Sequence, residues 1–430
     1  MGLALIALGE VHGRYPARMA RRVYLHIGTM KSATSYLQHL CAFNADHLAS
    51  AGLLWPPGDL RTQAVMDLLG WRGAGPEVSG AWQKLARATR RHDGDVLLSF
   101  ELLAGVKMGH IRRLVRSLDG EVHVVLTARD AGRLIPSHWQ TTIKNGYTHT
   151  WSQFARAICA EDDDPESRRL HDWFWKRQDL AAIIGRWQQH VPVERMSVVT
   201  VPPPGSDRDE MAHRFGAAVG VDLSGLPQPE TWTNVSLGAH SVELMRRLNA
   251  QLVDPEDRDE SRGCRRAMGR AFLLHSDKEP GFALSAAQQD WVRRRALATN
   301  AELASLPIRV VGHLDDLVPA ELPSPAAVDP SDTTEAELLE AAESSLIDAA
   351  KEAAELAASS ETVTAELQAV LRQKAKAELA SKRLRHRVQT LESTLGRRKV
   401  SRVARVLGGG RRGVSRAARA ARARVSHRGG

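Results

Sequence analysis

The sequence predicts an α/β fold, in which a doubly wound, mainly parallel sheet with a P-loop-like anion-binding loop is followed by a C-terminal coiled-coil helix and a basic tail. Three observations favour this organisation. Short runs rich in Val, Leu and Ile alternate with helical patterns over residues 22–322. Positions spaced by three and four residues form an unbroken seam from 339 to 395. Residues 397–430 contain twelve Lys or Arg and no Asp or Glu.

The composition limits the class of protein. The chain has 430 residues, of which 43% are hydrophobic, so a sizeable core can form. Its three cysteines are odd in number and far apart, which argues against a disulfide framework or a zinc site and favours a reducing cytoplasm. The net charge of +9 comes from the basic tail, because residues 1–396 alone carry −3. No run reaches the roughly 18 apolar residues of a membrane span.

Changes in composition divide the chain into segments. A short apolar run near the N-terminus ends at Glu10 and is a poor signal peptide. The proline-rich stretch that begins at Leu322 marks the end of the α/β domain. The predicted segments are an N-terminal extension 1–18, an α/β domain 19–322, a linker 323–331, a coiled-coil helix 332–396 and a basic tail 397–430.

The strands of the α/β domain are predicted from short apolar runs, which are typical of buried parallel strands. These runs are Val23–Ile27, Asp95–Phe100, Val122–Ala128, Met196–Val201 and Ile308–Val311. Helical patterns lie between them, as at Ile111–Leu118 and Asp179–His190. In such a sheet, ligands bind beyond the carboxyl ends of the strands.

The turn after the first strand has an anion-binding composition. A loop that joins a strand to a helix directs backbone N–H groups and the helix dipole at one point. Lys31 adds a positive charge there, and hydroxyl groups come from Ser32, Thr34 and Ser35. The loop can therefore hold a phosphate or a phosphosulfate. It does not match the loop that binds nucleoside triphosphates, because Met30 stands where that loop has glycine.

A second group of polar residues follows the run Val122–Ala128. Arg129 comes directly after it and offers a planar fork for a phosphate. Ser137 adds a hydroxyl eight residues later. Gln140 and Lys144 follow at helical spacing, so we expect their side chains to face the same cleft and to contact the substrate.

Both groups resemble signatures of the PAPS-dependent sulfotransferases, where PAPS is 3′-phosphoadenosine 5′-phosphosulfate. The stretch 30–35 is similar to the family's phosphosulfate loop, P-K-[ST]-G-T-[ST], at four of six positions, with Ala33 in place of glycine. Arg129 and Ser137 resemble the pair that holds the 3′-phosphate. Over residues 22–319 the chain looks like a bacterial sulfotransferase domain. Since alanine resists positive φ, we expect the loop to avoid that conformation at Ala33.

The resemblance implies an activity. PAPS would be the co-substrate, PAP the product, and a hydroxyl or amine of a glycan, glycolipid or small metabolite the acceptor, with no obligatory metal. Lys31 would contact the bridging oxygen of the leaving group. Glu101, at the end of a predicted strand, is our candidate for the base that takes the acceptor's proton, and His26 is its rival. The other open interpretations are an ATP-dependent kinase or phosphotransferase and a non-catalytic scaffold.

The C-terminal part of the chain predicts partners of other kinds. The seam is rich in alanine and contains Ser360, Lys374 and Ser381, so we expect a coiled-coil homo-oligomer, a parallel dimer by default, or else a single solvated helix. The basic tail is typical of a segment that binds an anionic membrane surface, nucleic acid, or nothing at all. Membrane contact would place a cytoplasmic enzyme at the inner membrane surface.

Overall fold

The structure is a computed structural model that describes residues 21–71, 75–228, 237–252, 264–265, 267–269, 272, 279–320 and 328–395. The predicted extension 1–18 and basic tail 397–430 lie outside the described residues, as does 323–327 of the predicted linker. The chain divides into two compact units, and the boundary between residues 349 and 350 lies within the long C-terminal helix.

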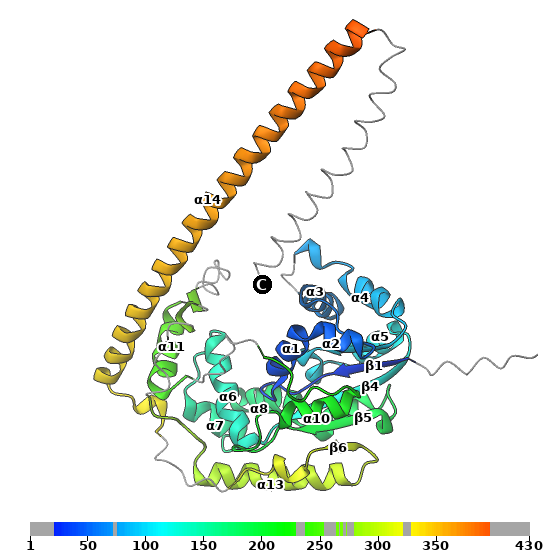
Figure 1. The fold of residues 1–430 in the computed structure, drawn as a ribbon. Helices are drawn as coiled ribbons and strands as arrows, with labels where there is room; N and C mark the ends of the chain where they lie inside the picture. The colour runs from blue at the N-terminus through cyan, green and yellow to red at the C-terminus, as the bar shows by residue number, and fades with distance from the viewer. Residues whose placement is uncertain are drawn as a thin grey trace, which may run out of the picture. The chain divides into compact units, whose positions relative to one another are not determined.

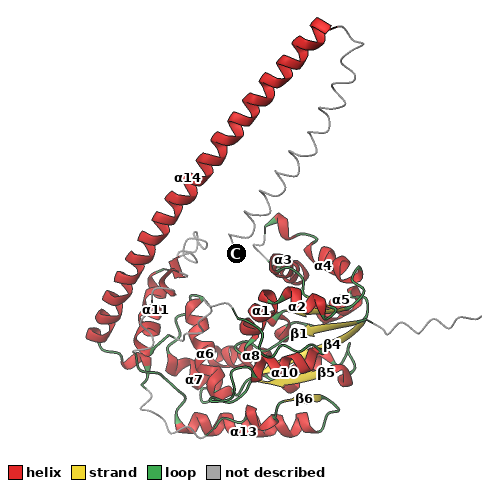
Figure 2. Cartoon of the chain, viewed as in Figure 1, coloured by secondary structure: helices red, strands yellow, loops and turns green. Residues whose placement is uncertain are grey.

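The prediction of an α/β fold with a parallel sheet is confirmed. Within the described residues, six strands pair in parallel in the order β2-β3-β1-β4-β5-β6. Figures 1 and 2 label β1, β4, β5 and β6 of this sheet. The strands are β1 (Arg22–His26), β2 (Leu53–Leu54), β3 (Asp95–Ser99), β4 (Glu121–Ala128), β5 (Met196–Thr200) and β6 (Arg309–Val311). All five predicted strands are present, and among the strands of the described residues β2 was not predicted. Since the chain crosses from β3 to β4, on opposite sides of β1, the strand order reverses beside β1, and this is where such sheets bind ligands.

The helices of the first unit follow the strands as a doubly wound fold requires. The α-helices are α1 (Thr34–Phe43), α2 (Ala45–Ser50), α3 (Gly58–Leu69), α4 (Ala81–Arg90), α5 (Met108–Ser117), α6 (Ala131–Lys144), α7 (Trp151–Ile158), α8 (Pro165–Gln178), α9 (Leu180–Trp187), α10 (Glu210–Val219), α11 (Ala239–Gln251) and α13 (Ala286–Ala304). Short 3-10 helices are η1 (Pro76–Val78), η2 (Glu101–Gly105), η3 (Val193–Arg195), η5 (Leu314–Leu317) and η6 (Pro330–Asp332).

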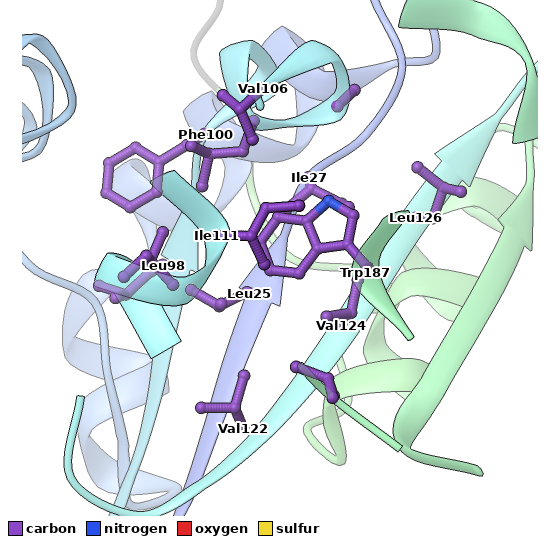
Figure 3. Packing of buried hydrophobic residues seen from close by; sticks show 14 of the residues in the cluster. Leu25, Ile27, Leu98, Phe100, Val106, Ile111, Val122, Val124, Leu126 and Trp187 are labelled. Atoms are coloured by element: carbon purple, nitrogen blue, oxygen red, sulfur yellow. The ribbon is translucent and has the colours of Figure 1, made fainter. Parts of the chain in front are cut away.

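Alternate residues of the strands pack on opposite faces of the sheet. Along β1, Val23 and Leu25 join one buried cluster, whereas Tyr24 joins the other. The first cluster also takes Ile111 of α5 and Trp187 of α9, which pack over the strands in Figure 3. Because both faces are covered by helices, the strands are apolar throughout, which is why short apolar runs predicted them.

A third cluster packs helices against one another beside the sheet. It joins α6, α7, α8, α11 and α13 through aromatic side chains, among them Trp139, Trp151, Phe174 and Trp175. These four side chains are buried. The tryptophans of α7 and α8 therefore belong to the core of this helical layer.

The long C-terminal helix is also confirmed. α14 (Glu335–Leu395) has 61 residues and begins at a capping box, in which Thr334 Oγ1 accepts from the Glu337 backbone N–H (3.3 Å) and Glu337 Oε2 accepts from the Thr334 backbone N–H (2.8 Å). Arg247 of α11 donates to Glu335 (2.8 Å), so the first turn of α14 contacts α11 within the first unit. Among the described residues, no helix has the length and apolar character needed to cross a membrane.

Candidate active site

The loop between β1 and α1 continues the pairing of β1 with β4. The backbone N–H of Ile27 donates to Val125 O (2.9 Å), and that of Thr29 donates to Thr127 O (3.0 Å). These bonds hold the first residues of the loop beside the carboxyl end of β4. The loop therefore starts at the point where the strand order reverses.

The backbone of this loop is left-handed at two residues that are not glycine. φ is 67° at Lys31 and 65° at Ala33, which is the N-cap of α1. The prediction that the loop avoids positive φ at Ala33 is therefore wrong. Each such residue costs roughly 1–3 kcal/mol, so the surrounding contacts must hold the loop in place. Alternation of left- and right-handed residues turns successive N–H groups towards one point, which suits an anion.

A chain of buried polar side chains lies beneath the loop. His26 is hydrogen-bonded through Nδ1 to Ser99 Oγ (2.9 Å) and through Nε2 to Thr127 Oγ1 (3.0 Å). Thr127 Oγ1 also bonds Ser32 Oγ (2.8 Å), and Ser32 Oγ donates to Thr29 O (2.5 Å). These contacts tie the loop to β1, β3 and β4 at once.

This network changes the roles of two predicted site residues. His26 is fully buried, and burial lowers its pKa to about 3, so the ring is neutral at ordinary pH. It does not line the cavity described below, and its surroundings are those of a packed, hydrogen-bonded histidine rather than a base. Ser32 is also fully buried, and its hydroxyl faces the network. The expectation that the Ser32 hydroxyl contacts a ligand is not met by this geometry.

Gly28 is needed for the same network to pack. A Cβ at this position would lie 2.0 Å from Thr127 Oγ1, 2.7 Å from His26 Nε2 and 2.8 Å from Thr34 Oγ1. Thr127 Oγ1 and His26 Nε2 cannot move without breaking the network, and Thr34 Oγ1 is buried beside them. The need for glycine here could not be predicted locally, because the φ of Gly28 is not positive and the requirement comes from side chains of other elements.

Arg129 directly follows β4, and its guanidinium has no hydrogen bond or ion pair with the described residues. The neighbouring Asp130 caps α6 by accepting from the Arg133 backbone N–H (2.9 Å) and also pairs with the Arg133 guanidinium. Arg129 Nε is buried and has no hydrogen-bond partner among the described residues. Burial is the main cause that lowers the Arg129 pKa, followed by the charge of Arg133.

One cavity of about 900 Å³ brings most of the predicted site residues together. The predicted residues that line it are Lys31, Ala33, Thr34, Ser35, Glu101, Arg129, Ser137, Gln140 and Lys144. They come from the segments that follow β1, β3 and β4, from the first turn of α1 and from the second to the last turn of α6. Thr34 Oγ1 is buried there without a hydrogen-bond partner in the described part of the chain. The cavity thus offers unpaired donors at two separate places, one at the loop and one at Arg129.

Electrostatics inside the cavity couple its charged groups. Burial raises the pKa of Glu101 to about 7, and the nearby Lys31 ammonium opposes that shift. Burial lowers the pKa of Lys31, which Glu101 opposes and Arg129 reinforces. The pKa of Lys144 falls to about 8, through burial first and then through the charge of Lys31. A carboxyl with a pKa near 7 can accept a proton at neutral pH.

Two of the predicted residues on α6 differ in how free they are. Gln140 is buried, and its Nε2 donates to Leu237 O (2.9 Å), so it ties α6 to the segment before α11. Lys144, the last residue of α6, lines the cavity, and no ion pair is found for it within the described residues. Gln140 therefore positions a wall of the cavity, whereas Lys144 is available to a ligand.

Sequence reasoning missed other lining residues. Arg208 follows β5 and lines the cavity. Because the carboxyl ends of parallel strands share one edge of the sheet, its place after a predicted strand could have marked Arg208 as a site residue. Tyr36, one turn into α1, accepts a hydrogen bond from Gln228 Nε2 (3.0 Å). Phe282 packs edge-on against Trp139, with ring centroids 5.2 Å apart, and no local pattern marks it.

Within the described residues, no three His, Cys, Asp or Glu side chains are grouped as metal ligands would be.

Comparisons with known proteins add little to this geometry. No protein-family model matches the chain, and no curated protein matches it. A solved structure, titled as the crystal structure of a sulfotransferase from Alicyclobacillus acidocaldarius, is similar at 16% sequence identity and a TM-score of 0.34. The match covers 54% of this chain and 94% of that one. The likeness is too distant to support an argument about function.

Proposed function

We propose that this protein is a sulfotransferase that moves a sulfuryl group from PAPS to a hydroxyl or amine acceptor. The observation that carries the proposal is that Lys31, Arg129 and Ser137 line one cavity at the reversal of the strand order. PAPS has anionic groups at two positions of its ribose, and two separate sets of donors in one cleft fit such a nucleotide.

The charge of the cavity fits a polyanion. Its lining residues include five Lys or Arg and one Glu. The unpaired Thr34 Oγ1 and Arg129 Nε would each gain a bond to an anionic oxygen. We assign the phosphosulfate to Lys31, Thr34, Ser35 and the N-terminus of α1, and the 3′-phosphate to Arg129 and Ser137. Arg208 is a further cation at the same edge.

The proposed reaction is a direct displacement at sulfur. The acceptor oxygen forms a bond to sulfur while the bond from sulfur to the bridging phosphate oxygen breaks, and PAP leaves with that oxygen. Glu101 takes the proton of the acceptor, which its pKa of about 7 permits. Lys31 stabilises the negative charge that builds up on the bridging oxygen. Lys144 would contact the acceptor or the transferred group.

Calorimetric titration with PAP tests the nucleotide site. We expect the unmodified protein to bind PAP, and Lys31→Ala and Arg129→Ala to bind it roughly 10- to 100-fold more weakly, as expected for the loss of charge-assisted hydrogen bonds. Arg112→Ala is the matched control, because Arg112 is exposed on α5 and does not line the cavity. Adenosine 5′-phosphosulfate, which lacks the 3′-phosphate, should lose little affinity in Arg129→Ala.

Other outcomes would favour the alternatives. Stabilisation by ATP with Mg²⁺ but not by PAP would favour a kinase or phosphotransferase. Binding of neither nucleotide would favour a non-catalytic scaffold. If PAP binds, release of PAP from PAPS in the presence of candidate acceptors tests transfer itself, and Glu101→Gln should slow it without weakening PAP binding.

A further inference from the structure

The second unit presents an apolar stripe on one face of α14. Large side chains of the 3-4 seam are more than half exposed, namely Leu356, Val363, Leu367, Val370 and Leu384. An apolar stripe of this length on a solvated helix indicates a surface that another helix covers. The helix part of this unit, residues 350–395, is about 69 Å long at 1.5 Å per residue.

Charge is segregated along the same helix. Residues 335–370 contain nine Asp or Glu and one Lys, whereas residues 371–395 contain seven Lys or Arg and two Glu. The two parts carry formal charges of −8 and +5. The helix dipole explains such a preference only in the first and last turns. A lone solvated helix would instead gain from opposite charges four residues apart, which segregation largely removes.

From these two features we infer that α14 pairs with α14 of a second copy of the chain in antiparallel orientation. The acidic part of each helix then lies along the basic part of its partner. In a parallel pair in register, like charges would lie side by side over the whole length. The parallel dimer expected from the seam alone is therefore disfavoured by the charge pattern.

The seam residues support a specific register. In a parallel pair in register, each seam position faces itself, so Ser360, Lys374 and Ser381 would each form a polar layer. In an antiparallel pair centred on residue 372, each position faces the one equally far on the other side of 372. Ser360 then faces the partner's Leu384, and Ser381 faces the partner's Val363.

The same register pairs the central layers by size. Lys374 faces the partner's Val370 and can extend its ammonium into water along that side chain. Leu367 faces the partner's Ala377. Each small or polar seam position among these layers thus meets a branched apolar side chain, and no layer is polar on both sides. This complementarity is independent of the charge segregation.

Light scattering on the full chain tests the pairing. We expect a dimer that weakens as salt rises, because the charges are partly screened. Leu384→Glu should shift the chain to monomer, because its carboxylate would face the acidic part of the partner. Leu379→Glu should not, since Leu379 is similarly exposed on the same helix but lies outside the seam. A monomer at every concentration, or equal effects of the two variants, would overturn the inference.

Cysteine crosslinking tests the orientation. Cys264 is the exposed cysteine of the described chain, so its replacement by serine gives a clean background. Ser360→Cys with Leu384→Cys in one chain should crosslink between copies through a short bismaleimide, whereas either substitution alone should not. Efficient crosslinking of the single variants would indicate a parallel pair and overturn the antiparallel one. A dimer in which no variant crosslinks would also overturn it.

Discussion

Lys31 and Glu101, which follow the neighbouring strands β1 and β3, line one cavity, and the charge of each stabilises the charged form of the other. Burial outweighs this attraction at Glu101, whose pKa rises to about 7. The carboxyl therefore changes its protonation state near neutral pH. A site that moves a proton at pH 7 needs such a group, but the same group weakens the fold when it is charged.

The first prediction concerns stability as a function of pH. A pKa raised above the unfolded value near 4.5 stabilises the fold fully below pH 4.5, and this contribution is lost as the pH rises through 7. Glu101→Gln removes this dependence. We expect the free energy of unfolding of the variant, relative to the unmodified protein, to rise by roughly 1–3 kcal/mol between pH 4.5 and pH 8. Urea denaturation at both pH values measures it, and a difference that does not change with pH would contradict the raised pKa.

The second prediction concerns the polar network beneath the loop. In Gly28→Ala, the added methyl group would overlap Thr127 Oγ1, His26 Nε2 and Thr34 Oγ1. We expect the free energy of unfolding to fall by roughly 1–3 kcal/mol, as in an overpacked core, and PAP binding to weaken with it. Thermal denaturation and calorimetry measure the two effects.

A matched glycine controls for the substitution itself. A Cβ at Gly185 in α9 would meet no atom within 4 Å. Gly185→Ala should therefore raise the free energy of unfolding by roughly 0.5–1 kcal/mol, because alanine favours the helix. If both variants behaved alike, the network would not depend on the missing side chain of Gly28.

The sheet was largely predictable from the sequence, because every strand covered on both faces is a run of apolar residues. β2 was missed because two residues, Leu53 and Leu54, are too few to form a pattern. The strand order was not predictable, since it depends on which strands pair across long stretches of chain. Once a parallel sheet was expected, Lys31 and Arg129 could be assigned to its carboxyl edge, because each follows a predicted strand, and their roles in binding stay predictions.

The inner side of the site could not be predicted from local patterns. Ser32 faces Thr127, which lies 95 residues further along the chain, so its inward direction depends on a tertiary contact. Ala33 adopts positive φ against its own preference because the surrounding contacts outweigh a cost of roughly 1–3 kcal/mol. In both cases tertiary contacts, rather than the preference of the residue itself, determine the conformation, as is common at functional sites.

The third prediction follows from that strain. In Ala33→Gly, the side chain that disfavours φ of 65° is removed. We expect the free energy of unfolding to rise by about 1 kcal/mol, because the relief of strain exceeds the added freedom of glycine in the unfolded chain. Thermal denaturation measures it.

Gly52→Ala is the matched control, because it makes the reverse change at a φ of 77° where a Cβ would meet no atom within 4 Å. It should lower the free energy of unfolding by a similar amount. A loss of stability in Ala33→Gly would show that Ala33 is not strained.

The last prediction concerns His26, whose pKa is lowered to about 3 by burial. A pKa below the unfolded value near 6.5 gives stability that is present above pH 6.5 and is lost as the pH falls towards 3. His26→Asn keeps a donor or acceptor near Ser99 but cannot be protonated. We expect it to lower the free energy of unfolding at pH 8, where the bond to Thr127 and some packing are lost. Between pH 6.5 and pH 4 the variant should lose less stability than the unmodified protein, so the two curves of unfolding free energy should converge. Urea denaturation measures the two curves. If they were parallel, His26 would become protonated in the fold as readily as in the unfolded chain. His26 would then again be a candidate for the base.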